Sequence, residues 1–249
     1  MPEINTSATK LTFKRYEKKY LLSAETHARL RERLDSMIEP DLYFASTVCS
    51  VYYDDDSYKL IRRSIDGPVY KEKLRLRSYN VPGPDDAVFV ELKKKYKGIV
   101  YKRRVSMTAA QAESYLAGEA PAPEDSQMIR EIDWFMKLYE PQPRAFIACD
   151  RTAYVAKSDP ELRITFDKDI RWRRDELRLT AGSHGEPLTQ PGMVLMEVKL
   201  PGVAPLWLAR MFSELGIVPT GFSKYGVAYK ENLIKDHMKD YINGVIFNA

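Results

Sequence analysis

The sequence is poor in the residues on which several common catalytic chemistries depend. Its 249 residues include only two cysteines and three histidines. Cys49 and Cys149 lie far apart and no CxxC pair is present, so neither a zinc site nor a redox motif is indicated. A P-loop is excluded because no GxxxxGK(S/T) motif occurs. The histidines lie outside the strand-like segments that carry charge, which argues against a phosphohistidine intermediate: His27, His184 and His237.

Long apolar runs are also missing. The first ten residues, MPEINTSATK, contain no hydrophobic segment of a secretory signal. No stretch approaches the ~18 apolar residues that a membrane helix needs. We therefore expect a soluble, cytoplasmic protein with no membrane segment of its own. The net charge is only +4, so the positions of the basic residues, and not their total, must indicate a polyanionic partner.

The composition predicts one folded domain. Hydrophobic residues make up 44% of the chain, which is enough to bury a sizeable core. Strand-like and helix-like segments follow one another from about residue 10 to about residue 230, and no linker of domain-boundary character interrupts them. We therefore assign residues 1–249 to a single domain, whose last helix is expected over residues 226–239.

One segment carries an unusual row of positive charge. Tyr70 to Ser78 reads YKEKLRLRS, and its alternation places Lys71, Lys73, Arg75 and Arg77 on one face and a mainly apolar set on the other. Four like charges in a row repel one another unless something neutralises them. The row therefore favours an interior or surface that binds a polyanion such as a chain of phosphates.

Other strand-like segments show the same division into a charged face and a largely apolar face. A sheet with one face in water also alternates in this way, but such faces usually mix charges with Ser, Thr and Gln. We therefore predict an α+β fold in which a closed antiparallel β-barrel has a charged interior and the helices pack on the outside. The charged sets are Arg15/Glu17/Lys19, Lys71/Lys73/Arg75/Arg77, Glu91/Lys93/Lys95, Lys102/Arg104, Arg163/Asp167 and Glu197/Lys199.

Such an interior has the chemistry for phosphoryl groups. Arginine presents forked donors that match phosphate oxygens, and lysine adds mobile point charges. Glu17 and Glu197 are hard oxygen ligands suited to Mg²⁺ or Mn²⁺. Glu91 is a third oxygen ligand of this kind, but for Glu91 and Asp167 we favour a structural role as charge partners of the neighbouring cations over a role as metal ligands. Phosphoryl transfer needs alignment and charge neutralisation more than a protein nucleophile, so no nucleophile is required.

The ordered motifs resemble those of the VTC domain, the polyphosphate polymerase branch of the triphosphate tunnel metalloenzyme (CYTH-like) superfamily. The resemblance spans about residues 10–230. It implies a tunnel barrel that transfers the γ-phosphate of ATP to growing inorganic polyphosphate with Mn²⁺ or Mg²⁺. The segments that carry it are RYEKKYLL (15–22), STVCSVYYDD (46–55), KEKLRLR (71–77), VFVELKKK (88–95), VYKRRVSM (100–107), DRTAYV (150–155), LRITFD (162–167), LMEVKL (195–200) and FSKYG (222–226).

The resemblance also implies roles for individual residues. Glu197 is similar to the metal ligand of the family, and Glu17 is a second candidate. Ser223 stands beside Lys224 in the last motif. The residues that resemble phosphate ligands are Lys19, Arg75, Arg77, Lys93, Lys102, Arg151, Arg163, Ser223 and Lys224. Those that resemble catalytic residues are Arg75, Arg77, Lys93, Arg151 and Arg163, whereas Lys71 and Lys73 are expected to supply only supporting charge.

Two positions depart from the family pattern. Hydrolase branches of the superfamily open with Glu-x-Glu-x-Lys, but here Arg15 replaces the first Glu. The loss of an acid should weaken a second metal site and the activation of water, which favours a polymerase over a triphosphatase. Gly221 stands where eukaryotic polymerases have a lysine, which removes one phosphate contact and leaves the effect on turnover or product length open.

The expected partners are ATP and inorganic polyphosphate or pyrophosphate. The alternative functions are hydrolysis of tripolyphosphate or nucleoside triphosphates by the same fold, and non-catalytic binding of polyphosphate. Nucleic-acid binding is disfavoured because the charged faces lack the interleaved aromatic residues on which bases stack. Any channel that moves the product across a membrane is expected to be a separate protein.

Overall fold

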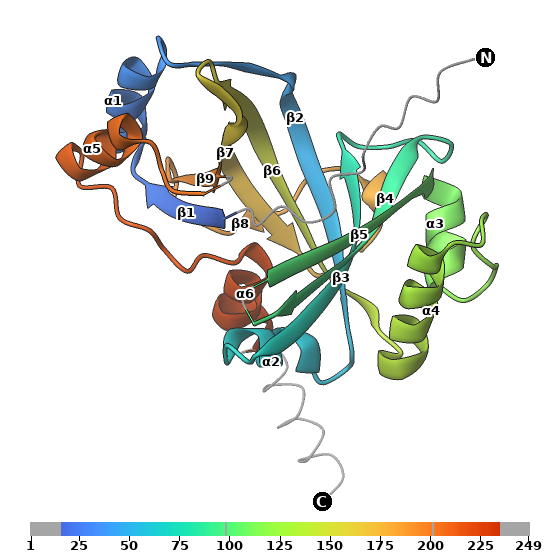
Figure 1. The fold of residues 1–249 in the computed structure, drawn as a ribbon. Helices are drawn as coiled ribbons and strands as arrows, with labels where there is room; N and C mark the ends of the chain where they lie inside the picture. The colour runs from blue at the N-terminus through green and yellow to red at the C-terminus, as the bar shows by residue number, and fades with distance from the viewer. Residues whose placement is uncertain (1–15, 98, 201, 235–249) are drawn as a thin grey trace, which may run out of the picture.

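The computed structural model describes residues 16–97, 99–200 and 202–234. Some predictions concern residues outside these ranges: Arg15, the strand residues expected before Tyr16, and the part of the last expected helix that follows residue 234. The chain forms an α+β fold, as predicted, with one large antiparallel sheet (Figure 1). The strands are β1 (Tyr16–Leu22), β2 (Ile38–Asp54), β3 (Tyr70–Tyr79), β4 (Ala87–Tyr96), β5 (Ile99–Thr108), β6 (Gln142–Ala156), β7 (Asp159–Arg173), β8 (Glu186–Pro187) and β9 (Val194–Leu200).

The helices form where the sequence provides apolar residues at helical spacing after a capping residue. Ser23 accepts from the backbone N–H of Thr26, and Thr108 forms a reciprocal capping box with Gln111. The helices are α1 (Ala24–Leu34), α2 (Lys59–Ile65), α3 (Ala109–Leu116), α4 (Gln127–Tyr139), α5 (Leu206–Glu214) and α6 (Lys224–Ala228), with a 3-10 turn η1 (Leu179–Ala181) and a π-helical turn η2 (Tyr229–Leu233).

The sheet curls but does not close among the described residues. Its order is β1-β9-β7-β6-β2-β3-β4-β5, with β8 paired to β7, so β1 and β5 are its two edges. A closed barrel is therefore not confirmed. The free side of β1 is partly occupied, because the Thr220 backbone N–H donates to the Lys19 carbonyl at 2.7 Å. The segment before α6, and not β5, thus lies along this edge.

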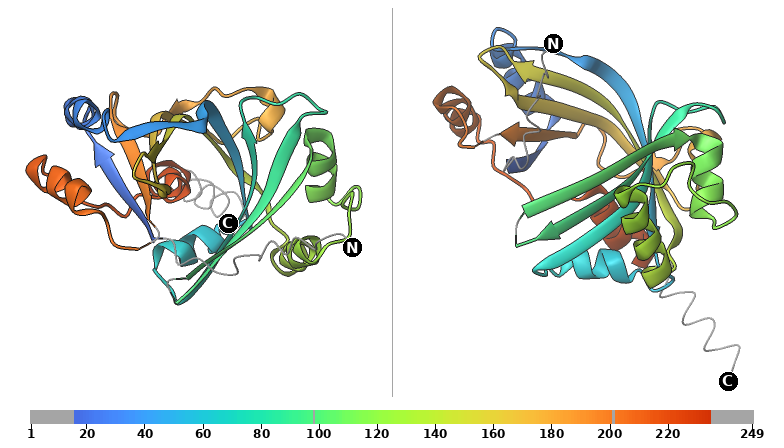
Figure 2. Two further views of the ribbon diagram at one scale, coloured as in Figure 1. Left: turned by 45° about the horizontal axis from the view of Figure 1, so that its top comes forward. Right: turned by 45° about the vertical axis from the view of Figure 1, so that its right-hand side comes forward.

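Four helices cover the convex side of the sheet, as Figure 2 shows. The apolar residues of α3 and α4 pack on β3, β4 and β5, for example Ile132 and Phe135 beside Leu74 and Leu92. On the other half, α1 and α5 pack on β1, β7 and β9. On the charged strands β1, β3, β4, β5 and β9, the apolar residues that alternate with the charged ones therefore face these helices, as the alternation predicted.

Two helices contradict the prediction that all helices lie outside. α2 and α6 pack against the concave side, where Ile61 and Tyr225 join a cluster with Tyr52 and Ile147. α6 lies within the curve of the sheet in Figure 2. The physical reason is that this end of the concave side is apolar, because the inward positions of β2 and β6 carry Tyr52, Ala145 and Ile147. These residues need a covering element, and α6 provides it.

The acidic turn after β2 fixes α2 and α6 together. The Asp54 carboxylate accepts from the backbone N–H groups of Leu60 and Ile61 at 2.9 Å each, and from the Tyr225 hydroxyl at 3.0 Å. The Asp54 carboxylate thus caps the first turn of α2. The Asp55 backbone N–H also donates to this carboxylate, at 3.0 Å. Because Asp54 is fully buried, the donors from Leu60, Ile61 and Tyr225 have no alternative partner in water.

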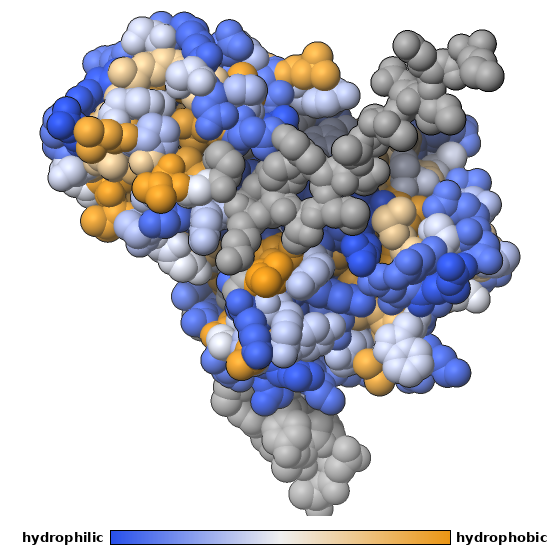
Figure 3. All heavy atoms as spheres, viewed as in Figure 1, coloured by the Kyte–Doolittle hydropathy of each residue, from blue (hydrophilic) through white to orange (hydrophobic). Residues whose placement is uncertain are grey.

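The described surface is mixed in character. Exposed apolar side chains gather around α5 and its flanking loops, where Val203, Leu206 and Val218 are exposed (Figure 3). Within the described ranges, none of the helices is both long enough and apolar enough to span a bilayer.

Replacing Asp54 with Ala tests the link between β2, α2 and α6. We expect Asp54→Ala to lower the free energy of unfolding by about 2–4 kcal/mol, because three buried donors lose their acceptor. Chemical denaturation monitored by circular dichroism measures the change. The exposed Asp85, replaced with Ala, serves as the control and should leave the unfolding midpoint unchanged. Equal midpoints for the two variants would contradict this role of Asp54.

Candidate functional site

The antiparallel register gathers charged side chains on the concave side of the sheet. Arg75 lies opposite Glu91, which in turn lies opposite Arg104. On the other half, Lys19 lies opposite Glu197. Residues directly opposite one another in a sheet share a face. We call this surface the charged face, and its members are Glu17, Lys19, Lys71, Lys73, Arg75, Arg77, Glu91, Lys93, Lys102, Arg104, Arg151, Asp167, Glu197 and Lys199.

One buried carboxylate organises the half of the charged face formed by β3, β4 and β5. The Glu91 side chain is 1% exposed and receives Arg75 Nε at 2.6 Å, Lys102 Nζ at 2.7 Å and Arg104 Nε at 2.7 Å. Arg77 Nε lies 3.9 Å away. These cations hold the pKa of Glu91 far below its usual range, although burial alone would raise it. Glu91 is therefore the charge partner that the sequence suggested.

Two further carboxylates organise the other half. Asp167 accepts two hydrogen bonds from Arg151, at 2.6 and 2.7 Å, and a third from Lys224 Nζ at 2.5 Å. Glu197 lies 3.1 Å from Lys19 Nζ and 3.6 Å from both Lys224 and Arg151. Despite burial, these cations keep the pKa of Glu197 well below its usual value. The bidentate contact fixes the plane of the Arg151 guanidinium.

The two halves face a common space. Arg77 on β3 lies near enough to Arg151 on β6 for the two charges to repel, and the charge of Lys93 on β4 lowers the pKa of Glu17 on β1, against the effect of its burial. β3 and β6 are separated only by β2, but β1 and β4 are far apart in the sheet order, so Lys93 can influence Glu17 only across the curve of the sheet (Figure 2). The charged side chains therefore converge on one volume.

α6 adds its own groups to this volume. Lys224 enters it from the first turn of α6, and the preceding Ser223 hydroxyl lies 3.3 Å from Lys73 Nζ. Lys73 therefore contacts a predicted phosphate ligand, although it was expected to supply only supporting charge. Lys71 differs, because its Nζ donates to the Ser64 carbonyl at 3.1 Å.

Cations outnumber carboxylates on the charged face, and the pKa values of two of its lysines are lowered. Burial and the neighbouring lysines lower the pKa of Lys73 to about 8. Burial also lowers the pKa of Lys102 to about 8, although Glu91 favours its charged form. A group whose charge is disfavoured in the free protein regains it when an anion binds. The face is therefore suited to a ligand with several negative charges.

The structure brings together most of the predicted phosphate ligands but leaves one at the rim. Arg163 shares the face of Asp167, yet its side chain is 50% exposed and lies 3.6 Å from Asp41. The reason is its position near the start of β7, away from the centre of the sheet. Some residues of the charged face were not among the predicted phosphate ligands, for example Lys73, Arg104 and Lys199.

Tyr52 is an inward-facing residue that the sequence analysis missed. Its hydroxyl lies 3.5 Å from Arg75 Nη1 on the charged face. The segment SVYYD contains two consecutive tyrosines, which point to opposite faces of the strand. The sequence alone does not fix the pairing register of this strand, and therefore does not show which tyrosine faces inward. The assumption that the charged faces lack aromatic residues is therefore wrong at this position.

The carboxylates offer a partial metal site. Glu17 and Glu197 lie on paired strands, and the charge of Glu197 raises the pKa of Glu17, so the two carboxylates are close. No group of three or more His, Cys, Asp and Glu side chains that could enclose a metal occurs within the described ranges. Mg²⁺ is commonly held by one or two carboxylates together with substrate phosphates. Glu17 and Glu197 fit that arrangement, in which the ion would neutralise phosphate charge.

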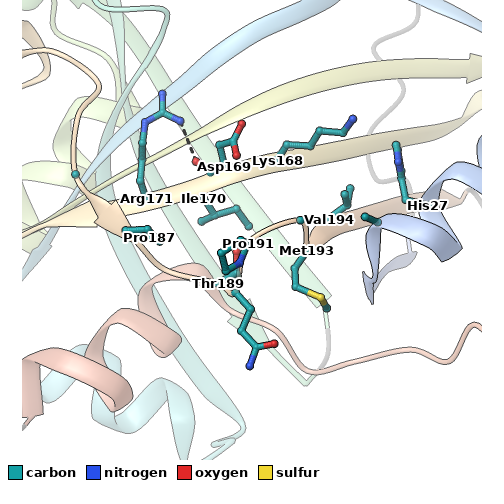
Figure 4. Close-up of a pocket in the computed structure, with 14 residues that line it drawn as sticks. His27, Lys168, Asp169, Ile170, Arg171, Pro187, Thr189, Pro191, Met193 and Val194 are labelled. Atoms are coloured by element: carbon teal, nitrogen blue, oxygen red, sulfur yellow. Dashed lines mark hydrogen bonds between the residues drawn. The ribbon is translucent and has the colours of Figure 1, made fainter.

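A separate cavity lies away from these residues. It has a volume of about 520 Å³ and is lined by His27 of α1, by Lys168 and Arg171 of β7, and by the segment that leads into β9 (Figure 4). Burial, with Lys168 and Arg31 nearby, lowers the pKa of His27 to about 4, so this imidazole is neutral at pH 7. None of the predicted site residues lines this cavity.

Comparisons with known proteins agree with this geometry. A family model described as VTC domain matches residues 14–232. Vacuolar transporter chaperone complex subunit 4 of Trypanosoma cruzi is 26% identical over 243 residues, which cover 80% of this chain and 30% of that protein. The subunit of the same name from Trypanosoma brucei brucei is 25% identical over 188 residues, covering 62% of this chain and 24% of that protein. This chain thus spans less than a third of the length of these relatives.

The fold is shared with a solved structure of low sequence identity. A proposed adenylate cyclase from Bacillus halodurans superposes with a TM-score of 0.52 at 13% identity. The match covers 83% of this chain and 92% of that one. At this identity the likeness concerns the fold alone.

The lowered lysine pKa values predict how anion binding depends on pH. Lys73 and Lys102 are charged below about pH 7 and lose their protons as the pH rises through 8. We expect the affinity for tripolyphosphate to fall about tenfold between about pH 7 and about pH 9.5, because Lys73 and Lys102 lose their charge while the arginines keep theirs. Isothermal titration calorimetry across this range measures the change.

The control for this prediction is Lys73→Arg, which keeps a positive charge at every pH of the series. Its pH profile should be flatter than that of the wild type. An affinity that does not change with pH in the wild type would contradict the assignment of these lysines to the binding surface.

Proposed function

This chain belongs to the VTC domain family, and on that premise we propose that it is a metal-dependent phosphotransferase that extends inorganic polyphosphate with the γ-phosphate of ATP. The observation that carries the proposal is the charged face: a converging excess of arginine and lysine, held in place by buried Glu91, Asp167 and Glu197. A chain of phosphates is the ligand whose charge and linear form this surface matches best.

Catalysis in this proposal depends on position and charge. Phosphoryl transfer passes through a state in which negative charge spreads over the oxygens of the transferring group. Arg151 is fixed by its two bonds to Asp167, and Arg75 is fixed by its bond to Glu91, so both guanidinium groups are held in place on the charged face. Fixed donors need no reorganisation as the charge develops, and this lowers the barrier.

Mg²⁺ or Mn²⁺ would be held by Glu197 and Glu17 together with phosphate oxygens. When bound, the ion supplies charge neutralisation and alignment of the phosphates. Lys19 lies 3.1 Å from Glu197 and 3.7 Å from Glu17, so it can exchange a carboxylate contact for a phosphate contact when the ion takes its place.

The finer architecture belongs to the same proposal. We propose that the charged face lines a tunnel in which the two edge strands, β1 and β5, flank the phosphate chain. We also propose a cytoplasmic location and a separate membrane protein as partner, because the two relatives are named as subunits of a vacuolar transporter chaperone complex.

Hydrolysis of tripolyphosphate or nucleoside triphosphate, and binding without turnover, use the same charged face and are the alternatives. The preference for a polymerase over a hydrolase depends on Arg15, which lies outside the described residues. Product analysis separates the three reactions directly.

The decisive assay incubates the protein with ATP and Mn²⁺ or Mg²⁺ and separates the products on a polyacrylamide gel. We expect long polyphosphate from the wild type. Glu197→Gln should abolish most of the product while binding of tripolyphosphate is retained, since the metal contact is lost but the cations remain. ADP and monophosphate without polymer would overturn the polymerase and favour the hydrolase, whereas binding without any turnover would favour the non-catalytic alternative.

Two cations of β3 provide a matched comparison in the same assay. Arg75→Ala should reduce turnover by at least about 100-fold, because its guanidinium faces the transferring phosphate. Lys71→Ala should change it less than about threefold, because Lys71 is tied to the Ser64 carbonyl at the edge of the face. A thermal melt of each variant controls for loss of folding. Equal reductions would show that the row acts only as diffuse charge.

A further inference from the structure

Tyr52 occupies a position on the charged face that is absent from the predicted ligands, although it lies within the motif segment STVCSVYYDD (46–55). It lies directly opposite Arg75 in the pairing of β2 with β3, and the residue is 8% exposed. Its hydroxyl is 3.5 Å from Arg75 Nη1, which donates toward it. The phenol therefore ends inside the cluster of arginines that the proposed function assigns to phosphate.

The ring of Tyr52 is held rigidly. It stacks on Tyr225 with a centroid distance of 4.8 Å and an interplanar angle of 17°. The Tyr225 hydroxyl donates to Asp54 at 3.0 Å, and Asp54 also caps α2. The Tyr52 hydroxyl is thus positioned by a buried chain of contacts that extends through two helices, which is the kind of support that a precisely placed ligand group requires.

The charged groups near the Tyr52 hydroxyl are cations from β3 and α6. Arg75 and Arg77 approach from β3 and Lys224 from α6, and together they lower the pKa of Tyr52 to about 8 against the effect of its burial. Lys73 is also close enough for the two charges to interact. Within residues 16–97, 99–200 and 202–234, no carboxylate or carbonyl group accepts the Tyr52 proton.

A buried hydroxyl normally has an acceptor for its proton. Here every charged neighbour of the hydroxyl is a donor, so none can fill that role. An anion in the common space would supply the missing acceptor while it binds the same arginines. At pH 7 the phenol is mostly protonated and available to donate.

We propose that Tyr52 is a further phosphate ligand, whose hydroxyl donates a hydrogen bond to an oxygen of the phosphate group that Arg75 and Lys224 also contact. The inference rests on the proposed function only for the class of its ligand, a condensed phosphate. No covalent step is involved, because Tyr52 keeps its proton and acts by binding and orienting the group.

The next residue in the chain is a matched control. Tyr53 lies on the same strand and is almost equally buried, at 7% exposed, but it faces the opposite way and packs in the core beneath α3. Burial raises the pKa of Tyr53, the opposite direction to Tyr52. Replacement of either residue with Phe removes one hydroxyl from one strand, and only the Tyr52 hydroxyl faces the charged face.

The experiment compares Tyr52→Phe with Tyr53→Phe, using tripolyphosphate as the probe. We expect about tenfold weaker binding for Tyr52→Phe by isothermal titration calorimetry, because a hydrogen bond to a charged group is lost. Tyr53→Phe should bind as the wild type does. Ultraviolet absorbance of tyrosinate provides a second readout: a group titrating near pH 8 should disappear in Tyr52→Phe and remain in Tyr53→Phe.

The same absorbance titration tests the contact in the wild type, even if a variant fails to fold. Tripolyphosphate should move the titration near pH 8 to higher pH, because added negative charge favours the protonated phenol. Unchanged affinity in Tyr52→Phe, or an unchanged wild-type titration with the ligand bound, would overturn the inference. If the wild type makes no polyphosphate but the titration still moves, the proposed reaction fails and the role of Tyr52 stands.

Discussion

The neutralisation of buried cations by a few buried carboxylates is the constraint on which the structure depends. Arginines and lysines from several strands share one concave side, and their repulsion in a poorly hydrated interior would oppose folding. Glu91, Asp167 and Glu197 offset it, each in contact with more than one cation. The carboxylates therefore make a binding surface of excess positive charge compatible with a folded sheet.

The same arrangement bears on which anions can bind. The cations already have partners in the free protein, so an incoming anion must compete with carboxylates that are held close and at short distance. A single phosphate replaces few of these contacts. A chain of phosphates replaces several at once, and because its groups are covalently linked, the entropy cost of association is not incurred separately for each group. Within the proposed function, selectivity for long ligands thus follows from the resting contacts of the site.

The alternation of charged and apolar residues predicted much of this site. It placed Arg75, Arg77 and Lys93 on one face because side-chain direction in a strand depends only on parity. It did not predict which strands would be edges, nor that α6 would lie inside the curve, because both depend on contacts between distant parts of the chain. The inward direction of Tyr52 was missed for a related reason. In a run of two tyrosines, only the pairing of β2 with β3 decides which of the two faces inward. The rim position of Arg163 likewise follows from where β7 begins.

α6 has a consequence for the order in which the molecule is assembled. Lys224 and Tyr225 contact Asp167 and Asp54, partners that precede them by 57 and 171 residues. During synthesis on the ribosome, the sheet can therefore be complete in sequence while Asp167 still lacks its second cation, Lys224, and Tyr52 lacks its stacking ring. The nascent chain acquires its finished anion-binding surface only when its last described helix has emerged, so maturation of the site is a late, long-range event in folding.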